Sequence, residues 1–91
     1  MKNSGTYESR YSIVALVGEA NKEGLTLYEA VKELNDAADR GVTKDATHIR
    51  RDNRCVGFWC DYYKSITPMF GARDDEAFLI GQWTESQCYM A

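Results

Sequence analysis

One stretch of the 91-residue chain, Cys55-Val56-Gly57-Phe58-Trp59-Cys60-Asp61-Tyr62-Tyr63, holds four aromatic residues and two of the three cysteines. We interpret residues 55–64 as a β-strand, in which successive side chains point to opposite faces of the sheet. One face would be apolar and typical of a core, with Val56, Phe58, Cys60 and Tyr62. The other face would carry Cys55, Gly57, Trp59, Asp61 and Tyr63. Two large aromatic rings beside a carboxylate are typical of a contact surface.

The residues before this stretch are predicted to pair with it in a hairpin. Residues 47–52 would form the partner strand, with a tight turn at Asp52-Asn53 or Asn53-Arg54, because asparagine tolerates the positive φ that such turns need. In either register Ile49 would lie on the face of Val56 and Phe58. By the same alternation, His48 and Arg50 would lie on the face of Gly57 and Trp59. This agreement favours a hairpin with one core face and one contact face.

Residues 27–40 are predicted to form an amphipathic helix. Thr26 and Glu29 have the spacing of a capping box, in which each side chain binds a backbone amide of the first turn. Gly41 suits a left-handed cap at the other end. Apolar residues follow the three-and-four spacing of one buried stripe: Leu27, Ala30, Val31, Leu34, Ala37 and Ala38.

The remaining segments complete the predicted fold class, which is α+β. Residues 10–18 are apolar on both alternating faces and indicate a central strand, with a buried helix as the alternative. Residues 19–25 are expected to form a turn region, and residues 65–68 to break the strand, because proline cannot donate to a ladder. Residues 78–83 are predicted to be the last strand. The expected product is one domain over 1–91, with a three- to four-stranded, mainly antiparallel sheet, the helix packed on one face and a loosely ordered segment at 1–9.

Charge and cysteine content limit the classes of function. The net charge of −3 is unevenly distributed, with −4 over residues 19–39 (two lysines, six acids) and +3 over residues 40–54 (five basic residues, two acids). An odd number of cysteines argues against a closed disulfide framework and fits a reducing compartment. No apolar run approaches the ~20 residues that cross a bilayer. We therefore expect a soluble, cytoplasmic protein with no membrane partner.

No arrangement of residues in the sequence predicts catalysis, a metal site or a cofactor. A zinc site would need four ligands from His48, Cys55, Cys60 and Cys88, but Cys55 and Cys60 would point to opposite faces of one strand. His48 could activate a cysteine, but no cleft is implied around it. Cys60 is expected in the core and the other two thiols are expected to be incidental. Three adjacent acids at 74–76 are interpreted as a solvated loop.

The sequence therefore predicts a non-enzymatic protein–protein interaction module, with a partner-binding face made of His48, Arg50, Arg54, Trp59, Asp61 and Tyr63. Small size and the absence of a catalytic motif are compatible with an anti-defence role, in which a phage or mobile-element inhibitor occludes a host enzyme or defence complex. One alternative is a single-stranded nucleic-acid-binding module that uses Arg50, Arg51 and Arg54 with Trp59 and Tyr63. The acidic pI of about 5.0 argues against it. A homodimeric structural domain is the other alternative.

Overall fold

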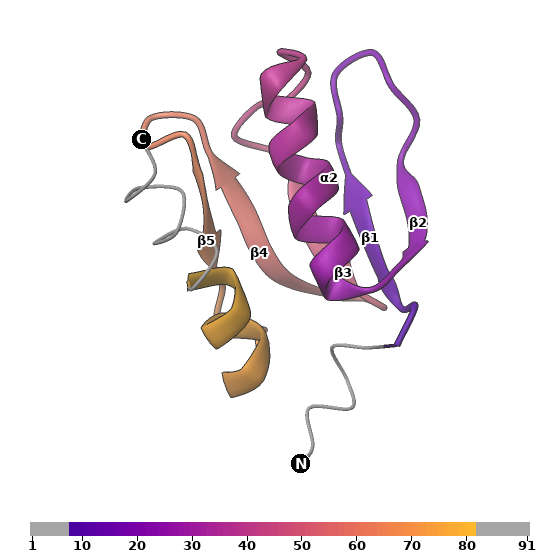
Figure 1. Ribbon diagram of the computed structural model, residues 1–91, viewed down its shortest axis with the longest axis vertical. Coiled ribbons are helices and arrows are strands. Elements are labelled where there is room, and N and C mark those ends of the chain that lie inside the picture. Colours follow the sequence, from indigo (N-terminus) through magenta and orange to yellow (C-terminus); the bar gives the residue numbers. More distant parts are fainter. Residues whose placement is uncertain (1–7, 82–91) are drawn as a thin grey trace.

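The computed structural model describes residues 8–81 as a β-sheet with two helices on one of its faces (Figure 1). The sheet has five antiparallel strands in the order β2-β1-β3-β4-β5. These strands are β1 (Tyr11–Val14), β2 (Lys22–Leu25), β3 (His48–Arg51), β4 (Arg54–Cys60) and β5 (Ser65–Pro68). The predicted α+β class is confirmed in this broad form.

The amphipathic helix α2 spans Leu27–Asp39 and begins where the sequence predicts. The hydroxyl of Thr26 accepts from the amide of Glu29 at 3.2 Å, and the Glu29 carboxylate accepts from the amide of Thr26 at 2.9 Å. Gly41 has a φ of +75°, which a residue without Cβ adopts at no steric cost. The capping box and the helix end are therefore confirmed.

The core lies between the two helices and the sheet. Every side chain of the predicted helix stripe is buried except Ala38, which is half-buried. From the sheet, the fully or almost fully buried side chains are Tyr11, Ile13, Ile49, Val56, Trp59 and Ile66. Ile80 joins them from the second helix. This packing removes apolar surface from water along the whole width of the sheet.

Several predicted elements differ from the structure. Residues 22–25 form the edge strand β2 rather than part of a turn, and their charged side chains are tolerated because a sheet edge faces water. Residues 65–68 form the other edge strand, β5, where Pro68 is the last residue and costs few ladder bonds. The predicted strands over 10–18 and 55–64 are also shorter in the structure.

Residues 74–81 are helical, so the predicted strand at 78–83 is wrong for the residues that the structure describes. Glu76 and Ile80 are both buried, and their separation of four residues places them on one helix face. Phe78 points away from the core and is 69% exposed. Acidic residues at the start of this segment also favour a helix N-terminus. Residues 82 and 83 of the predicted strand lie outside the described part of the chain, as do residues 1–7 of the predicted loose segment.

Candidate functional site

A β-bulge in the β3–β4 hairpin determines which aromatic side chain enters the core. The turn is at Asp52-Asn53, and Arg51 pairs with Arg54 and Arg50 with Cys55. The register then shifts, so that Ile49 pairs with Gly57 and His48 with Phe58. An extra residue on one strand moves all following side chains to the other face.

As a consequence, Trp59 is buried and only 2% exposed, on the sheet face that the helices cover. Phe58 lies on the opposite face and is half-buried. The predictions that Trp59 is exposed and that Phe58 belongs to the core are therefore wrong. Cys60 is half-buried, like Cys55, so its predicted place in the core is also wrong.

The predicted partner-binding residues do not form one face. His48 and Arg50 lie half-buried on the side of the sheet opposite the two helices, whereas Arg54 is exposed at the start of β4. Asp61 and Tyr63 are exposed in the turn that follows β4. Trp59 lies beneath this turn. The structure thus brings together Trp59, Asp61 and Tyr63 at one end of β4. His48 is near this end but on the opposite face of the sheet, and Arg50 and Arg54 lie toward the other end.

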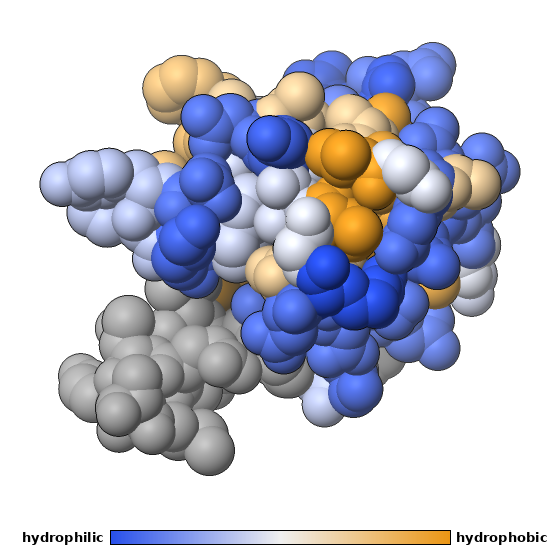
Figure 2. All heavy atoms as spheres, turned by 90° about the horizontal axis from the view of Figure 1, so that it is seen from above, coloured by the Kyte–Doolittle hydropathy of each residue, from blue (hydrophilic) through white to orange (hydrophobic). Residues whose placement is uncertain are grey.

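This end of the molecule contains an open hollow of about 680 Å³ between the C-terminal half of α2 and the β4–β5 turn. Three lysines and three aspartates line it: Lys32, Asp36, Asp39, Lys44, Asp61 and Lys64. Trp59 forms part of the wall. Figure 2 looks onto this end and shows a small apolar area among hydrophilic side chains. Val17, which is 44% exposed, is at this end, where its amide donates to the carbonyl of Val42 at 2.8 Å.

Trp59 lines the hollow and also lies close to Asp61 in the β4–β5 turn. Its Nε1 atom is buried and has no hydrogen-bond partner within the described residues. The pKa of Asp61 is lowered, mainly by the ammonium group of Lys64 and next by the indole of Trp59. The Asp61 carboxylate is therefore near enough to the indole N–H to be influenced by it, but the two groups do not form a hydrogen bond of normal geometry.

Tyr62 and Tyr63 project from the β4–β5 turn into solvent. Their side chains are 83% and 74% exposed, and the two rings meet edge to face with centroids 4.9 Å apart. The turn beneath them is fixed at several points. The amide of Asp61 donates to Asp45 at 3.1 Å, and Lys64 forms an ion pair with Asp61 at 2.9 Å. The two rings are therefore held on an ordered backbone.

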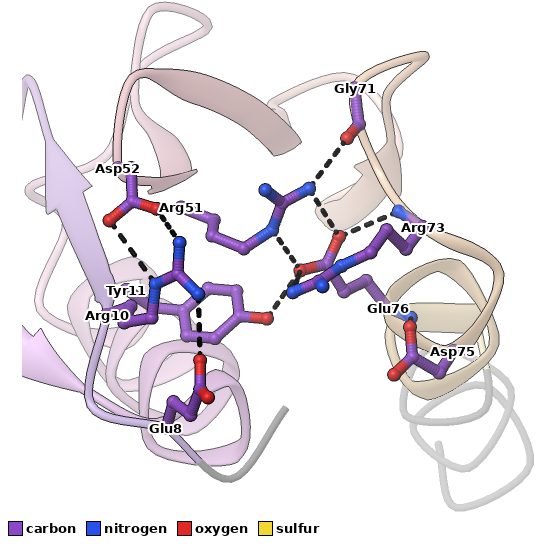
Figure 3. Close-up of polar contacts among 9 residues, drawn as sticks. All are labelled: Glu8, Arg10, Tyr11, Arg51, Asp52, Gly71, Arg73, Asp75 and Glu76. Carbon is purple, nitrogen blue, oxygen red and sulfur yellow. Dashed lines mark hydrogen bonds and ion pairs between the residues drawn. The ribbon is translucent and has the colours of Figure 1, made fainter. Parts of the chain in front are cut away.

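A buried carboxylate cluster joins the second helix to the sheet (Figure 3). Glu76 is fully buried, and its Oε2 atom accepts from Nε of Arg51 at 2.6 Å and from the hydroxyl of Tyr11. Its Oε1 atom accepts from the amide of Arg73 at 2.7 Å. Burial opposes ionisation, but these donors outweigh it and lower the pKa of Glu76. Burial and the neighbouring Glu76 raise the pKa of Tyr11, so the phenol remains a donor.

This cluster corrects the interpretation of residues 74–76 as a solvated loop. The only local signal for this cluster is weak: Arg73 and Glu76 are three residues apart. Arg51 and Tyr11 come from strands that are distant in the chain. All its donors and acceptors come from within the protein. We therefore interpret the cluster as a structural contact that holds the 74–81 helix against β1 and β3.

The residues of the nucleic-acid alternative do not lie on one surface. Arg51 is engaged by Glu76, with its side chain 13% exposed, and Trp59 is in the core. Arg54 is the first residue of β4, and Tyr63 follows the other end of the strand. A continuous surface of cations and stacking rings, which single-strand binding uses, is therefore not formed by these residues.

Comparisons with protein-family models, curated proteins and solved structures found no match to this chain. Within residues 8–81, no helix is long and apolar enough to cross a membrane. The same residues contain no group of three or more His, Cys, Asp or Glu side chains arranged around a possible metal ion.

Proposed function

We propose that this domain is a non-enzymatic protein-binding module that engages its partner through Tyr62 and Tyr63. The observation that carries this proposal is the exposure of two adjacent aromatic rings, 83% and 74%, on one turn. Tyrosine is enriched among the residues that dominate binding energy, since its ring buries apolar area while its hydroxyl keeps a polar contact.

The fixed turn adds to this argument. Association costs free energy when flexible side chains and loops become ordered, so an anchor on an ordered backbone retains more of its contact energy. The Asp61–Lys64 ion pair and the Asp45 contact supply that order before any partner arrives. The neighbouring hollow, with both signs of charge on its walls, offers polar contacts around the aromatic anchor.

The identity of the partner is a separate question. Inhibition of a host enzyme or defence complex remains a prediction from chain size and composition. Self-association through the same tyrosines is the homodimer alternative.

Photo-crosslinking tests the proposal directly. We would place benzoylphenylalanine at position 62 in the cells that make the protein, with the same probe at Tyr28, 54% exposed at the start of α2, as the matched control. We expect one protein to crosslink at position 62 and not at position 28. Identical products at both positions would contradict the proposal, and a crosslink between two copies of the chain would favour the homodimer.

A quantitative measurement follows from the crosslinked partner. The double variant Tyr62→Ala/Tyr63→Ala should lose more than about 2 kcal/mol of binding, because both anchors are removed. Its free energy of unfolding should remain that of the wild-type protein, since both side chains are in water.

A further inference from the structure

The most exposed apolar side chain in the described chain is far from the tyrosines. Phe70 lies in the loop between β5 and the 74–81 helix, and its relative exposure is 104%. A single exposed apolar side chain is common on protein surfaces, so the exposure of Phe70 marks a contact surface only if its neighbours add further apolar area or charge. The neighbours of Phe70 are a hollow and an exposed arginine, and these make the surface around it a candidate contact site.

The backbone on both sides of Phe70 is fixed. The amide of Met69 donates to the carbonyl of Val56 at 2.9 Å, and the Arg51 guanidinium donates to the carbonyl of Gly71 at 3.2 Å. A Cβ on Gly71 would lie 2.5 Å from the carbonyl oxygen of Cys55. Only glycine permits such a close approach without a shift of the backbone. Phe70 is thus held out on a loop that packs tightly against β4.

A second hollow, of about 520 Å³, lies between this loop and the β3–β4 turn. Its lining is apolar at Met69, Phe70 and Cys55 and charged at Arg51, Asp52 and Arg54, of which Arg51 and Asp52 are already paired with Glu76 and Arg10. The Arg54 side chain lies over Gly71, since a Cβ there would be 2.5 Å from its Cγ atom. The Arg54 side chain therefore lies against the residue that follows Phe70.

Two of the arginines at this end of the sheet, Arg50 and Arg54, have no ion pair with a described residue, and of these two only Arg54 is exposed. Arg10 pairs with Asp52 and Glu8, whereas Arg51 and Arg73 pair with Glu76. A guanidinium without a carboxylate, next to an apolar hollow, is complementary to a ligand that has both an apolar side chain and a negative charge.

We propose that the Phe70–Arg54 surface binds an acidic peptide segment of a second partner. An apolar side chain of that segment enters the hollow against Phe70 and Met69, and a neighbouring carboxylate pairs with Arg54. This surface lies beyond the opposite end of β4 from Tyr62 and Tyr63. The domain would then hold two protein segments at once, which goes beyond the function proposed above.

A library of displayed random peptides tests this inference with the intact chain. Peptides selected on the wild-type protein should combine Asp or Glu with a large apolar residue. Their binding, measured by fluorescence anisotropy, should weaken by at least about tenfold in Phe70→Ala and in Arg54→Glu. The matched control is Tyr62→Ala/Tyr63→Ala, which removes two other exposed rings and should bind the peptides as the wild type does.

Several results would overturn the inference. Selected peptides without carboxylates, equal binding by the variants, or no enrichment over the unselected library would each exclude an acidic peptide ligand. A dimer in size-exclusion chromatography that Phe70→Ala dissociates would assign the surface to a second copy of the chain. Thermal melts of both variants must match the wild type, so that a loss of binding reports the surface and not the fold. Loss of peptide binding in the tyrosine control alone would assign the peptides to the first surface.

Discussion

Glu76 shows how a single buried charge can hold an element in place. Its carboxylate lies on the second helix, whereas Arg51 and Tyr11 belong to two neighbouring strands. Removing one member of such a group leaves an uncompensated charge in a dry environment, which costs more than the intact group contributes. The cluster therefore makes the attachment of the 74–81 helix sensitive to one side chain.

The first prediction concerns this carboxylate and pH. Glu76→Gln should lower the free energy of unfolding by about 3 to 5 kcal/mol at neutral pH, because the Arg51 charge loses its partner. The folded-state pKa of Glu76 lies below its usual value of 4.5. Its contribution is therefore complete above that value and is lost as the pH falls toward the folded-state pKa. Urea unfolding of both proteins between neutral and acidic pH measures this.

The role of the Glu76 charge is supported if the difference in free energy of unfolding between wild type and Glu76→Gln becomes smaller at acidic pH. Exposed carboxylates titrate in both proteins, so their effects cancel in the difference. A difference that stays constant with pH would show that Glu76 acts through its shape and not through its charge.

The second prediction separates the two neighbouring aromatics of β4. Trp59→Ala should cost about 3 to 5 kcal/mol, since a buried ring is removed and a cavity remains. Phe58→Ala should cost clearly less, because Phe58 lies half-buried on the face opposite the two helices. Denaturant midpoints of the two variants provide the comparison. Equal costs, or a larger cost at Phe58, would mean that the bulge is misplaced.

At the level of elements, α2 is determined by its own sequence. The third prediction is that Thr26→Ala lowers the free energy of unfolding by about 1 kcal/mol, because the amide of Glu29 loses its acceptor. Thr26→Ser keeps a hydroxyl and serves as the control. Thermal melts are sufficient to detect the change, and a serine variant as unstable as the alanine variant would place the effect outside the cap.

Local signals explain why the helix could be predicted and two strands could not. The capping box, the apolar stripe and Gly41 all lie within one short segment. By contrast, β2 and β5 are edge strands whose polar residues and proline resemble a turn and a breaker. Their pairing with β1 and β4 is a tertiary property that overrides local propensity.

The bulge between Ile49 and Arg50 limited the prediction of the site. Up to that point the hairpin has the expected register, with Arg50 opposite Cys55. The composition of residues 55–57 does not indicate an extra residue in the strand. A shift of the pairing register by one residue exchanges the two faces of the sheet for all following side chains. The predicted exposure of Asp61 and Tyr63 did not depend on the register, because both residues lie in the turn after the strand.

At the scale of the whole molecule, the two proposed surfaces lie beyond opposite ends of one strand. β4 runs between Arg54 and Cys60 and pairs on both sides, so it is an interior strand of the sheet. The tyrosine pair follows its C-terminal end, and the Phe70–Arg54 surface lies at its N-terminal end. A rigid strand therefore fixes the distance between the surfaces, and a change at one need not disturb the other.

The order β2-β1-β3-β4-β5 also has a kinetic consequence. The pairs β1–β2, β3–β4 and β4–β5 are hairpins between strands that follow each other in the chain. Pairing of β1 with β3 instead joins residues 11–14 to 48–51 across all of β2 and α2. The entropy of closing that loop is lost before its contacts form, and such non-local pairings slow folding. We expect two separately formed halves, a hairpin with its helix and a three-stranded meander, whose docking along β1 and β3 limits the folding rate.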